Sequence, residues 1–232
     1  MRASSAYQAV CKEKYAPEKT FHGKANCVAV PVGGQMRNLE RTRGALLAAG
    51  FQLIFRRGFQ GVSVADIVQQ AGLTKGAFFH HFENKQELGY AVVDETIREL
   101  MMNRWIRPME NSSHPTKAIL TQLKKVIDET PEERLALGCP LNNLMQEMSS
   151  VDTVFHEKLQ SVLLMWIDET ERQLKRAKQM GQLKPGVKPR QAAEFIVMAH
   201  EGFFGIIKGL GDKRIFRSLY ESLKIYIEAI SE

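Results

Sequence analysis

Ala71-Gly-Leu-Thr-Lys-Gly-Ala-Phe-Phe-His-His-Phe-Glu-Asn-Lys85 is the stretch that decides how this chain folds. Gly72 tolerates the positive φ that a tight turn between two helices requires. Thr74 is a suitable N-cap for a short helix over residues 75–80, and another short helix over residues 63–70 precedes the turn. Two short helices joined in this way predict a helix-turn-helix, the motif that places its second helix in the major groove of DNA.

The first turn of that second helix carries the residue types that a DNA-reading helix needs. The Thr74 hydroxyl can donate to a phosphate, and the Lys75 ammonium can reach a guanine edge. Gly76 and Ala77 are small, so the backbone can approach the groove closely. The N-terminal end of the helix adds partial positive charge. Double-stranded DNA is therefore the predicted partner.

The rest of the patterned chain also reads as helical. Apolar residues recur at helical spacing from Leu39 to Phe55, Arg57-Gly58 ends that helix, and Asn84 can cap a helix that extends to about Trp105. Proline and glycine mark the breaks between further helices, which we expect near residues 116–130, 140–149, 152–180, 189–210 and 213–230. No convincing β alternation is present, so the sequence predicts an all-α protein.

Positive charge is concentrated in the N-terminal third of the chain. The net charge is +6: residues 1–35 carry five basic and two acidic side chains, residues 36–85 carry seven and three, and the remaining 147 residues carry 20 and 21. A basic head on a nearly neutral body is typical of a protein that binds phosphate backbones.

Composition argues against several classes of protein. Of the 232 residues, 44% are hydrophobic and 25% charged, the balance of a globular protein with a real core. No apolar run approaches the ~18 residues that span a bilayer, and we expect no membrane partner. Cys11, Cys27 and Cys139 lack metal-type spacing, so we predict no disulfide framework, no metal, no cofactor and a cytoplasmic location. Without a nucleophile elbow, phosphate loop or acid–base constellation, we do not expect an enzyme.

The first 35 residues lack a sustained period and end in Val30-Pro-Val-Gly-Gly-Gln35, which is typical of a linker. We interpret residues 1–36 as a disordered extension, either a mis-assigned upstream start or a non-native addition, with Met36 as the native start. The alternative is a basic arm that follows DNA.

Ser63-Val-Ala-Asp-Ile-Val-Gln-Gln-Ala-Gly-Leu-Thr-Lys-Gly-Ala-Phe-Phe-His-His-Phe-Glu-Asn-Lys-Gln-Glu-Leu88 resembles the DNA-binding domain of the tetracycline-repressor (TetR) family, as do the preceding basic helix and Arg57-Gly58-Phe59. The helical remainder agrees with the family in length and pattern. The resemblance implies a three-helix helix-turn-helix DNA-binding domain over residues 37–85. It implies a larger helical ligand-binding and dimerisation domain over residues 86–232.

Carried over position by position, the resemblance implies phosphate contacts from Ser63, Thr74 and Lys85 and base or groove contacts from Lys75, Gly76, Ala77 and His80. For Ser63, a simple helix cap is the alternative. Phe79 stands where the family usually has tyrosine, so packing or sugar contact replaces a phenol–phosphate hydrogen bond. Val68 stands where alanine is usual, and it can alter the angle between the two helices.

The last two expected helices have apolar faces. The first face comprises Phe195, Met198, Ala199, Gly202, Phe203, Ile206 and Gly209, and the second comprises Phe216, Leu219, Leu223, Tyr226, Ile227 and Ile230. For any one of these residues, core within a single chain is the alternative. In the family the corresponding helices form a four-helix bundle with a second copy, so the resemblance implies a homodimer on a palindromic operator.

The central helices would enclose a pocket for an unknown small-molecule effector. Its candidate lining residues are Trp105, Met145, Met148, Phe155, Met165, Trp166 and His200. Methionine and aromatic side chains suit an adaptable apolar site, but the same residues are ordinary core.

Leu137-Gly-Cys-Pro-Leu-Asn-Asn-Leu-Met-Gln-Glu-Met148 resembles a stretch found in a subset of the family, some of whose members sense electrophiles or oxidants through its cysteine. Cys139 precedes Pro140 at an expected helix N-terminus, where the helix dipole would lower the pKa of the thiol. Glu147 could bind a polar ligand group. The alternative is a buried cysteine that acts as a small apolar filler.

These observations together predict a ligand-responsive, sequence-specific DNA-binding transcriptional regulator. By default it is a repressor that a small molecule releases from its operator. The alternatives are an activator of the same family, or a sensor or adaptor whose helix-turn-helix does not bind DNA.

Overall fold

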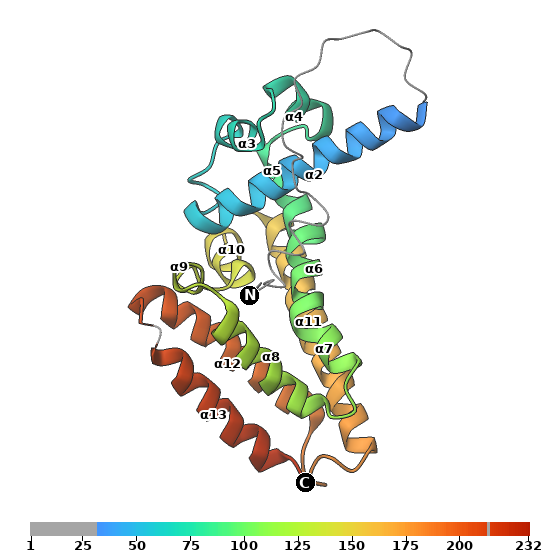
Figure 1. Ribbon diagram of the computed structural model, residues 1–232, viewed down its shortest axis with the longest axis vertical. Coiled ribbons are helices and arrows are strands. Elements are labelled where there is room, and N and C mark those ends of the chain that lie inside the picture. The colour runs from blue at the N-terminus through green and yellow to red at the C-terminus, as the bar shows by residue number, and fades with distance from the viewer. Residues whose placement is uncertain (1–31, 213) are drawn as a thin grey trace, which may run out of the picture. The chain divides into compact units, whose positions relative to one another are not determined.

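The computed structural model describes residues 32–212 and 214–232, which form helices and loops without a β-strand (Figure 1). A single isolated bridge joins Leu183 and Ser231. The all-α prediction is therefore confirmed. In the described part of the chain, no helix combines the length and the apolar character needed to cross a membrane. The chain divides after Val92 into two compact units.

Within residues 32–92, the described part of the first unit, the helices are α2 (Val32–Arg57), α3 (Val64–Ala71), α4 (Lys75–His81) and α5 (Lys85–Ala91). α2 packs against the other three. It begins at Val32, inside the segment that the sequence assigned to an extension, whereas residues 1–31 lie outside the described part of the chain. It ends where Gly58 takes a positive φ of 78° and its N–H donates to the Ile54 carbonyl at 2.9 Å.

The core of the first unit follows from the helical periodicity of its apolar residues. Phe78 of α4 has no exposed surface, and its ring lies 5.7 Å from that of Phe82 between centroids. The other main core side chains come from α2, α3 and α5: Leu46, Leu47, Phe51, Ile54, Phe55, Ile67, Val68 and Leu88. Val68, the departure from the family's usual alanine, is thus accommodated as part of this core.

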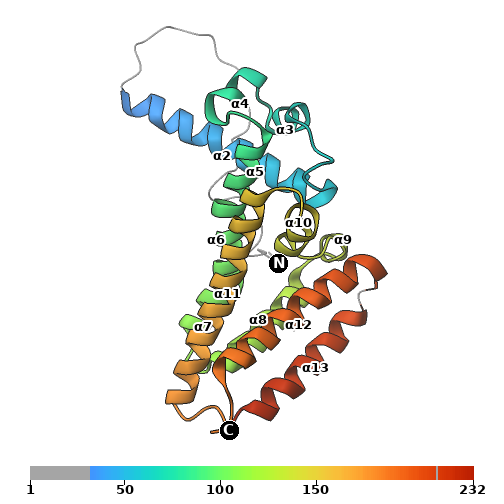
Figure 2. The same cartoon turned by 180° about the vertical axis from the view of Figure 1, so that it is seen from behind.

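The second unit is a bundle of helices of unequal length. After η1 (Val92–Ile97), which spans the division, its elements are α6 (Arg98–Met101), η2 (Met102–Ile106), α7 (Arg107–Glu110), α8 (Pro115–Glu129), α9 (Glu132–Leu135), α10 (Pro140–Met148), α11 (Thr153–Gln179), α12 (Pro189–Leu210) and α13 (Arg214–Ile230). α11 packs along α12, and α13 packs against both α8 and α12 (Figure 2).

The helix predicted from residue 85 to about residue 105 extends to Glu110 and contains two π-helical segments, η1 and η2. The second segment ends directly before Arg107-Pro108. A proline inside a helix lacks the N–H donor, and its ring collides with the carbonyl four residues earlier. A wider π-helical turn relieves this collision, which gives η2 a local physical cause.

Arg176 of α11 connects two parts of the second unit. Its guanidinium donates to the carbonyls of Met109 at 2.6 Å, Ser112 at 2.8 Å and Glu110 at 3.0 Å. These carbonyls lie at and just after the C-terminal end of α7, where helix carbonyls have no partner within the helix. Arg176 therefore caps α7 and fixes the loop that leads to α8.

Replacing Asp152 with alanine should lower the free energy of unfolding by about 1 kcal/mol, because α11 then loses its N-cap. The Asp152 carboxylate accepts a hydrogen bond from the Phe155 N–H at 3.0 Å. Asp152→Asn is the matched control, since an amide oxygen caps equally well, and it should retain most of the stability. Urea unfolding of both variants tests this expectation; equal losses would show that the cap is not the cause.

Candidate nucleic-acid interface

The turn between α3 and α4 has the left-handed backbone that the sequence predicted for Gly72. Its φ is 64°, and its N–H donates to the Gln69 carbonyl at 3.1 Å. The next N–H, of Leu73, donates to the Val68 carbonyl at 2.8 Å. Paired bonds of this kind close a helix end firmly, so the direction in which α4 leaves the turn is fixed by the backbone.

α4 presents its predicted reading residues to solvent. Lys75, Gly76, Phe79 and His80 are exposed, and Ala77 is half-buried. The Thr74 hydroxyl oxygen accepts from the Ala77 N–H at 3.2 Å, which caps the helix. Because a hydroxyl also has one donor, Thr74 can donate a hydrogen bond while it caps α4.

Phe79 is an apolar ring in an exposed position. Its side chain is 56% exposed, and its edge-to-face contact with the buried Phe78, at 5.3 Å between centroids, holds it at the surface. A ring without a hydroxyl can contact deoxyribose or the thymine methyl group. The structure shows packing of Phe79 against Phe78, and the sugar contact stays a prediction.

His80 and His81 lie side by side at the end of α4, with ring centroids 5.2 Å apart. Burial lowers the pKa of His81, and the neighbouring His80 and Arg43 lower it further. His81 is thus biased toward its neutral form, whereas His80 remains exposed on the reading face.

Ser63 is engaged in a complete capping box. Its hydroxyl accepts from the Asp66 N–H at 3.2 Å and donates to the Asp66 carboxylate at 2.6 Å. Hydrogen bonds from Ser63, and the nearby Arg57 guanidinium, lower the pKa of Asp66. The structure therefore supports the simple-cap alternative for Ser63, because its hydroxyl proton is already bonded within the protein.

Lys85 is also placed differently from the predicted phosphate contact. Its ammonium donates to the carbonyls of Val62 at 2.9 Å and Phe59 at 3.0 Å, and it lies 4.3 Å from the centre of the Phe59 ring. Two of its three protons are thus bonded to the loop between α2 and α3. Lys85 stabilises that loop, and the predicted phosphate contact, which would use its third proton, stays a prediction.

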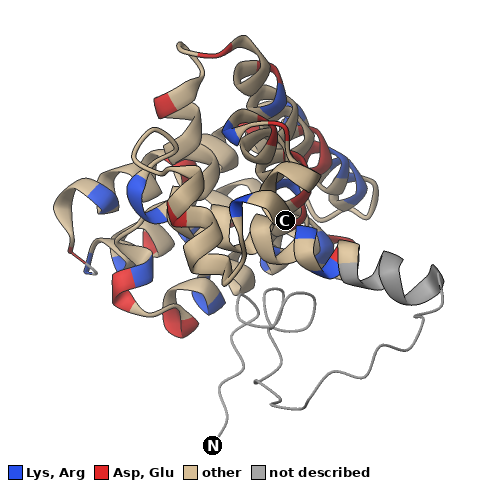
Figure 3. Ribbon diagram, turned by 90° about the horizontal axis from the view of Figure 1, so that it is seen from above, with Lys and Arg blue, Asp and Glu red and all other residues tan. Residues whose placement is uncertain are grey.

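The distribution of charged residues does not by itself show where α4 lies. Figure 3 shows Lys and Arg positions on helices throughout the described chain, interspersed with Asp and Glu. The basic excess of the N-terminal third therefore does not by itself single out α4.

The second unit holds a small cavity of about 20 Å³, which has room for about one water molecule. It is lined by Trp105, Met109, Ile119, Leu123, Trp166, Thr170, Ile196, His200, Leu219 and Leu223. Trp105, Trp166 and His200 were among the predicted lining residues, whereas Met145, Met148, Phe155, Met165 and Cys139 do not line this cavity. Thr170 was missed, although it lies one helical turn after Trp166 on the same buried face of α11.

Cys139 is the N-cap residue of α10, but its thiol is 4% exposed. Burial, followed by the charge of the Glu201 carboxylate, raises the pKa of this thiol well above its ordinary value. The predicted lowering by the helix dipole is therefore wrong, because loss of solvent outweighs the dipole. The structure favours the alternative of a buried, apolar cysteine.

The segment around Cys139 is held tightly against α12. The Asn142 side chain donates to the Glu201 carbonyl at 2.8 Å, and the Asn143 side chain donates to the Leu137 carbonyl at 2.7 Å. Gly138 has a φ of 78°, and a Cβ there would lie 3.0 Å from the Phe204 carbonyl oxygen. The glycine and the two asparagines therefore have a packing role that the sequence did not reveal.

α12 and α13 divide their apolar residues between two environments. Phe203, Phe216, Leu219, Leu223 and Ile227 are buried within the chain. Phe195, Met198, Ile206 and Leu210 of α12 and Ile225 of α13 are exposed by 43–67%. Gly202 and Gly209 of α12 have no atom within 4 Å of an added Cβ. Of the residues predicted for the interface, Phe195, Met198, Gly202, Ile206 and Gly209 are exposed in the single chain, whereas Leu210 and Ile225 were not predicted.

Family models match parts of both units. A family model described as bacterial regulatory proteins, tetR family, matches residues 46–92, and a second, described as tetracyclin repressor-like, C-terminal domain, matches residues 116–223. An uncharacterized HTH-type transcriptional regulator in the lacX 3' region of Lactococcus lactis subsp. lactis is 25% identical over 201 residues, which are 85% of this chain and 99% of that protein.

One further curated protein and one solved structure are also similar to this chain. The HTH-type transcriptional repressor DhaR of Mycobacterium sp. (strain GP1) is 27% identical over 161 residues, which are 69% of this chain and 79% of DhaR. The crystal structure of a TetR transcriptional regulator from Chloroflexus aurantiacus J-10-FL superposes with a TM-score of 0.74 at 24% identity, covering 84% of this chain and 98% of that chain.

The Cys139 thiol should react slowly with iodoacetamide at pH 7, because its raised pKa leaves little thiolate. Mass spectrometry of the digested chain separates this site from Cys11 and Cys27. A urea-unfolded sample is the control, and there the Cys139 peptide should be alkylated at least about tenfold faster, since a free thiol has a pKa of about 8.5. Equal rates in the folded and unfolded chains would contradict the burial seen here.

Proposed function

This chain belongs to the TetR family of bacterial regulatory proteins, and we propose that it acts as a homodimeric repressor that a small molecule releases from a palindromic operator. It is a helix-turn-helix transcriptional regulator. The observation that supports DNA binding most directly is the exposed row Lys75, Gly76, Phe79 and His80 on a helix whose direction is fixed at Gly72.

The roles along α4 follow from side-chain chemistry. Lys75 would donate to the acceptors on a guanine edge, and Gly76 and Ala77 would allow the helix to enter the groove. The Thr74 hydroxyl would position the helix on a phosphate. Phe79 would contact sugar or a thymine methyl, because it lacks a polar atom. We place this activity in the cytoplasm, where the DNA of a bacterium lies.

Dimerisation is supported by the exposed side chains of α12 and α13. Phe195, Met198, Ile206 and Leu210 leave an apolar strip on α12, and Gly202 and Gly209 let a second helix approach closely. Contiguous exposed apolar surface of this kind typically marks an interface. A two-fold dimer would present two copies of α4 to half-sites about 34–36 Å apart, which is one turn of DNA.

Repression and release are the finer parts of the proposal. DhaR, described as a repressor, matches over 69% of this chain, and a small cavity, which an effector would have to widen, lies among the helices of the second unit. An effector that binds one conformer more tightly lowers DNA affinity by the difference in its binding free energy between conformers. In vitro transcription from the bound promoter distinguishes a repressor from an activator.

The full-length protein should select discrete sites from fragmented genomic DNA of its source organism. On a selected site, Lys75→Ala should weaken binding by about tenfold or more, since one good base contact contributes about 1–3 kcal/mol of discrimination. Binding to unrelated DNA should change much less. Lys117→Ala, an exposed lysine of α8, is the matched control and should bind normally. Failure to enrich any sequence would contradict the proposal.

Ile206→Lys should convert the dimer to a monomer and reduce operator affinity, because it places a charge in the apolar strip of α12. Ile206 is 55% exposed in the single chain. Leu164→Lys is the matched control: Leu164 is 43% exposed on α11, outside the proposed strip. Light scattering after size-exclusion chromatography measures the mass of both variants. A dimer that survives Ile206→Lys but not Leu164→Lys would place the interface elsewhere.

A further inference from the structure

A groove of about 580 Å³ lies between α8 and the first half of α13. It is lined by Lys124, Ile127 and Asp128 of α8 and by Arg214, Arg217, Tyr220 and Glu221 of α13. The charged side chains among these are exposed, so the groove is open to solvent. Binding sites for small molecules typically have volumes of about 300–1,000 Å³. Unlike the cavity of about 20 Å³ in the same unit, the groove therefore has room for an organic molecule.

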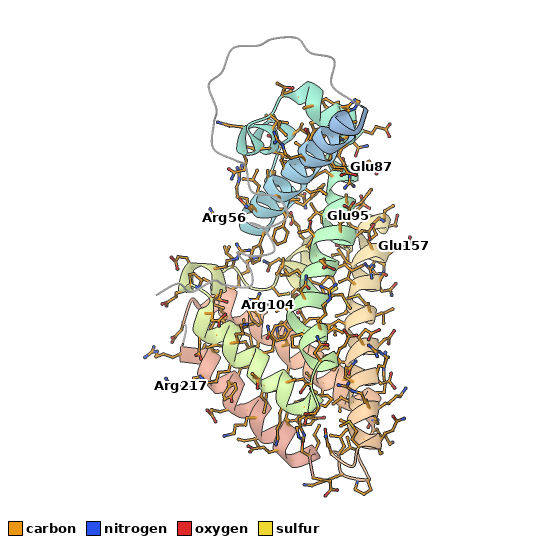
Figure 4. All side chains as sticks on the ribbon, turned by 45° about the vertical axis from the view of Figure 1, so that its right-hand side comes forward. Arg56, Glu87, Glu95, Arg104, Glu157 and Arg217 are labelled. Atoms are coloured by element: carbon orange, nitrogen blue, oxygen red, sulfur yellow. The ribbon has the colours of Figure 1, made fainter. Side chains whose placement is uncertain are left out.

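The basic side chains of the groove differ in whether they have acidic partners. The Lys124 ammonium donates to the Asp128 carboxylate at 2.7 Å, and the Arg214 guanidinium donates to the Asp212 carboxylate at 2.9 Å. Arg217, labelled in Figure 4, forms no ion pair or hydrogen bond with any described residue. The N–H donors of its guanidinium are therefore available to a ligand.

Lys124 and Arg217 approach each other from different helices. Asp128 raises the pKa of Lys124, and the positive charge of Arg217 opposes this effect. Electrostatic effects of this kind weaken with distance, so the two cations lie near each other. Asp128 offsets the charge of Lys124 only, and the repulsion by Arg217 remains. An anion bound beside Arg217 would offset this repulsion.

The balance of charge in the groove limits the charge of a ligand. Three basic and two acidic side chains line it, which leaves a net charge of +1. Glu221, one helical turn after Arg217, has no ion-pair partner among the described residues. A second negative charge on a ligand would therefore be repelled by Glu221 or Asp128. A cation beside Glu221 would in turn be repelled by Arg217 and Lys124.

Ile127 and Tyr220 give the groove an uncharged wall. Both side chains are half-buried, and the Tyr220 hydroxyl forms no hydrogen bond with a described residue. Tyr220 follows Arg217 by three residues, which places the two on the same face of α13. A guanidinium and a hydroxyl on one face can donate together to the oxygens of a carboxylate. The carbon skeleton of the same molecule would then cover Ile127 and exclude water from it.

We propose that the groove between α8 and α13 binds a small organic acid as its carboxylate, which accepts hydrogen bonds from Arg217 and Tyr220 while its carbon skeleton covers Ile127. This site is distinct from the helix-turn-helix, and the inference does not depend on the proposed function. Lys124 contributes electrostatic attraction without a direct contact, since its ammonium is already bonded to Asp128. A monocarboxylate fits this arrangement better than a neutral amide or a dicarboxylate.

Benzoate, benzamide and benzamidine are matched probes, because they share a phenyl ring and carry a negative, a neutral and a positive group. Ligand-observed NMR titration of the full-length protein at low ionic strength should show benzoate binding at least about fivefold more tightly than either of the others. Charge-assisted hydrogen bonds to a guanidinium give a preference of this size. The preference should shrink as salt is added, since the groove is open to solvent.

Arg217→Gln removes the guanidinium and keeps a polar side chain, so it should reduce the affinity for benzoate to about that for benzamide. Lys125→Gln is the matched control: it removes one positive charge from an exposed neighbour of Lys124 that does not line the groove, and the preference should remain. Tyr220→Phe should weaken benzoate binding by about twofold to tenfold, because one hydrogen bond is lost. Circular dichroism verifies that the variants fold.

Benzamidine binding more tightly than benzoate would overturn the proposal, because Asp128 and Glu221 would then determine what the groove binds. Equal binding of benzoate and benzamide, no binding of any probe, or an unchanged preference in Arg217→Gln would also overturn it. None of these outcomes bears on DNA binding, which the selection of genomic fragments tests separately.

Discussion

At Gly72 the backbone reverses direction with a φ of 64°, a conformation that costs a side-chain-bearing residue energy and glycine almost none. The reversal lets α3 and α4 share Phe78 as a common core residue, and that ring is fully buried. Because side-chain directions on a helix follow from its axis, the exposure of Lys75 and Phe79 depends on this one turn. Which residues of α4 are exposed therefore depends first on the backbone at Gly72 and only then on the side chains.

Local signals explain why so much of the fold was predictable. Ser63, Thr74 and Asn84 are N-caps as predicted, because capping involves a side chain and an N–H only three residues away. The roles of Ser63 and Lys85 were harder to predict. Lys85 bonds to the Phe59 carbonyl, 26 residues away in sequence, and such a partner leaves no periodic trace. The π-helical turns of η1 and η2 were also missed, since apolar spacing does not distinguish them from an α-helix.

The residues that line the cavity of the second unit could be predicted only in part, for a different reason. Apolar spacing indicates which face of a helix is buried, and it identified Trp105, Trp166 and His200. It cannot tell which buried residues meet across a cavity, so Met145 and Met148 were equally good candidates. Cys139 combines two opposing effects, a helix N-terminus and complete burial. The magnitude of burial is a tertiary property, and it decides the protonation of the thiol. The Asn142 and Gly138 contacts with α12 create that burial.

Gly202 and Gly209 of α12 would affect which subunits pair after duplication of the gene. In the proposed dimer, Gly202 and Gly209, whose added Cβ atoms would meet nothing within 4 Å in the single chain, would leave space for a side chain of the other copy. A duplicate that acquires a bulky residue at Gly202 would clash with its own twin across a symmetric contact, yet it would still fit the ancestral glycine-bearing subunit. One substitution would thus favour a mixed pair before it favours two separate lineages.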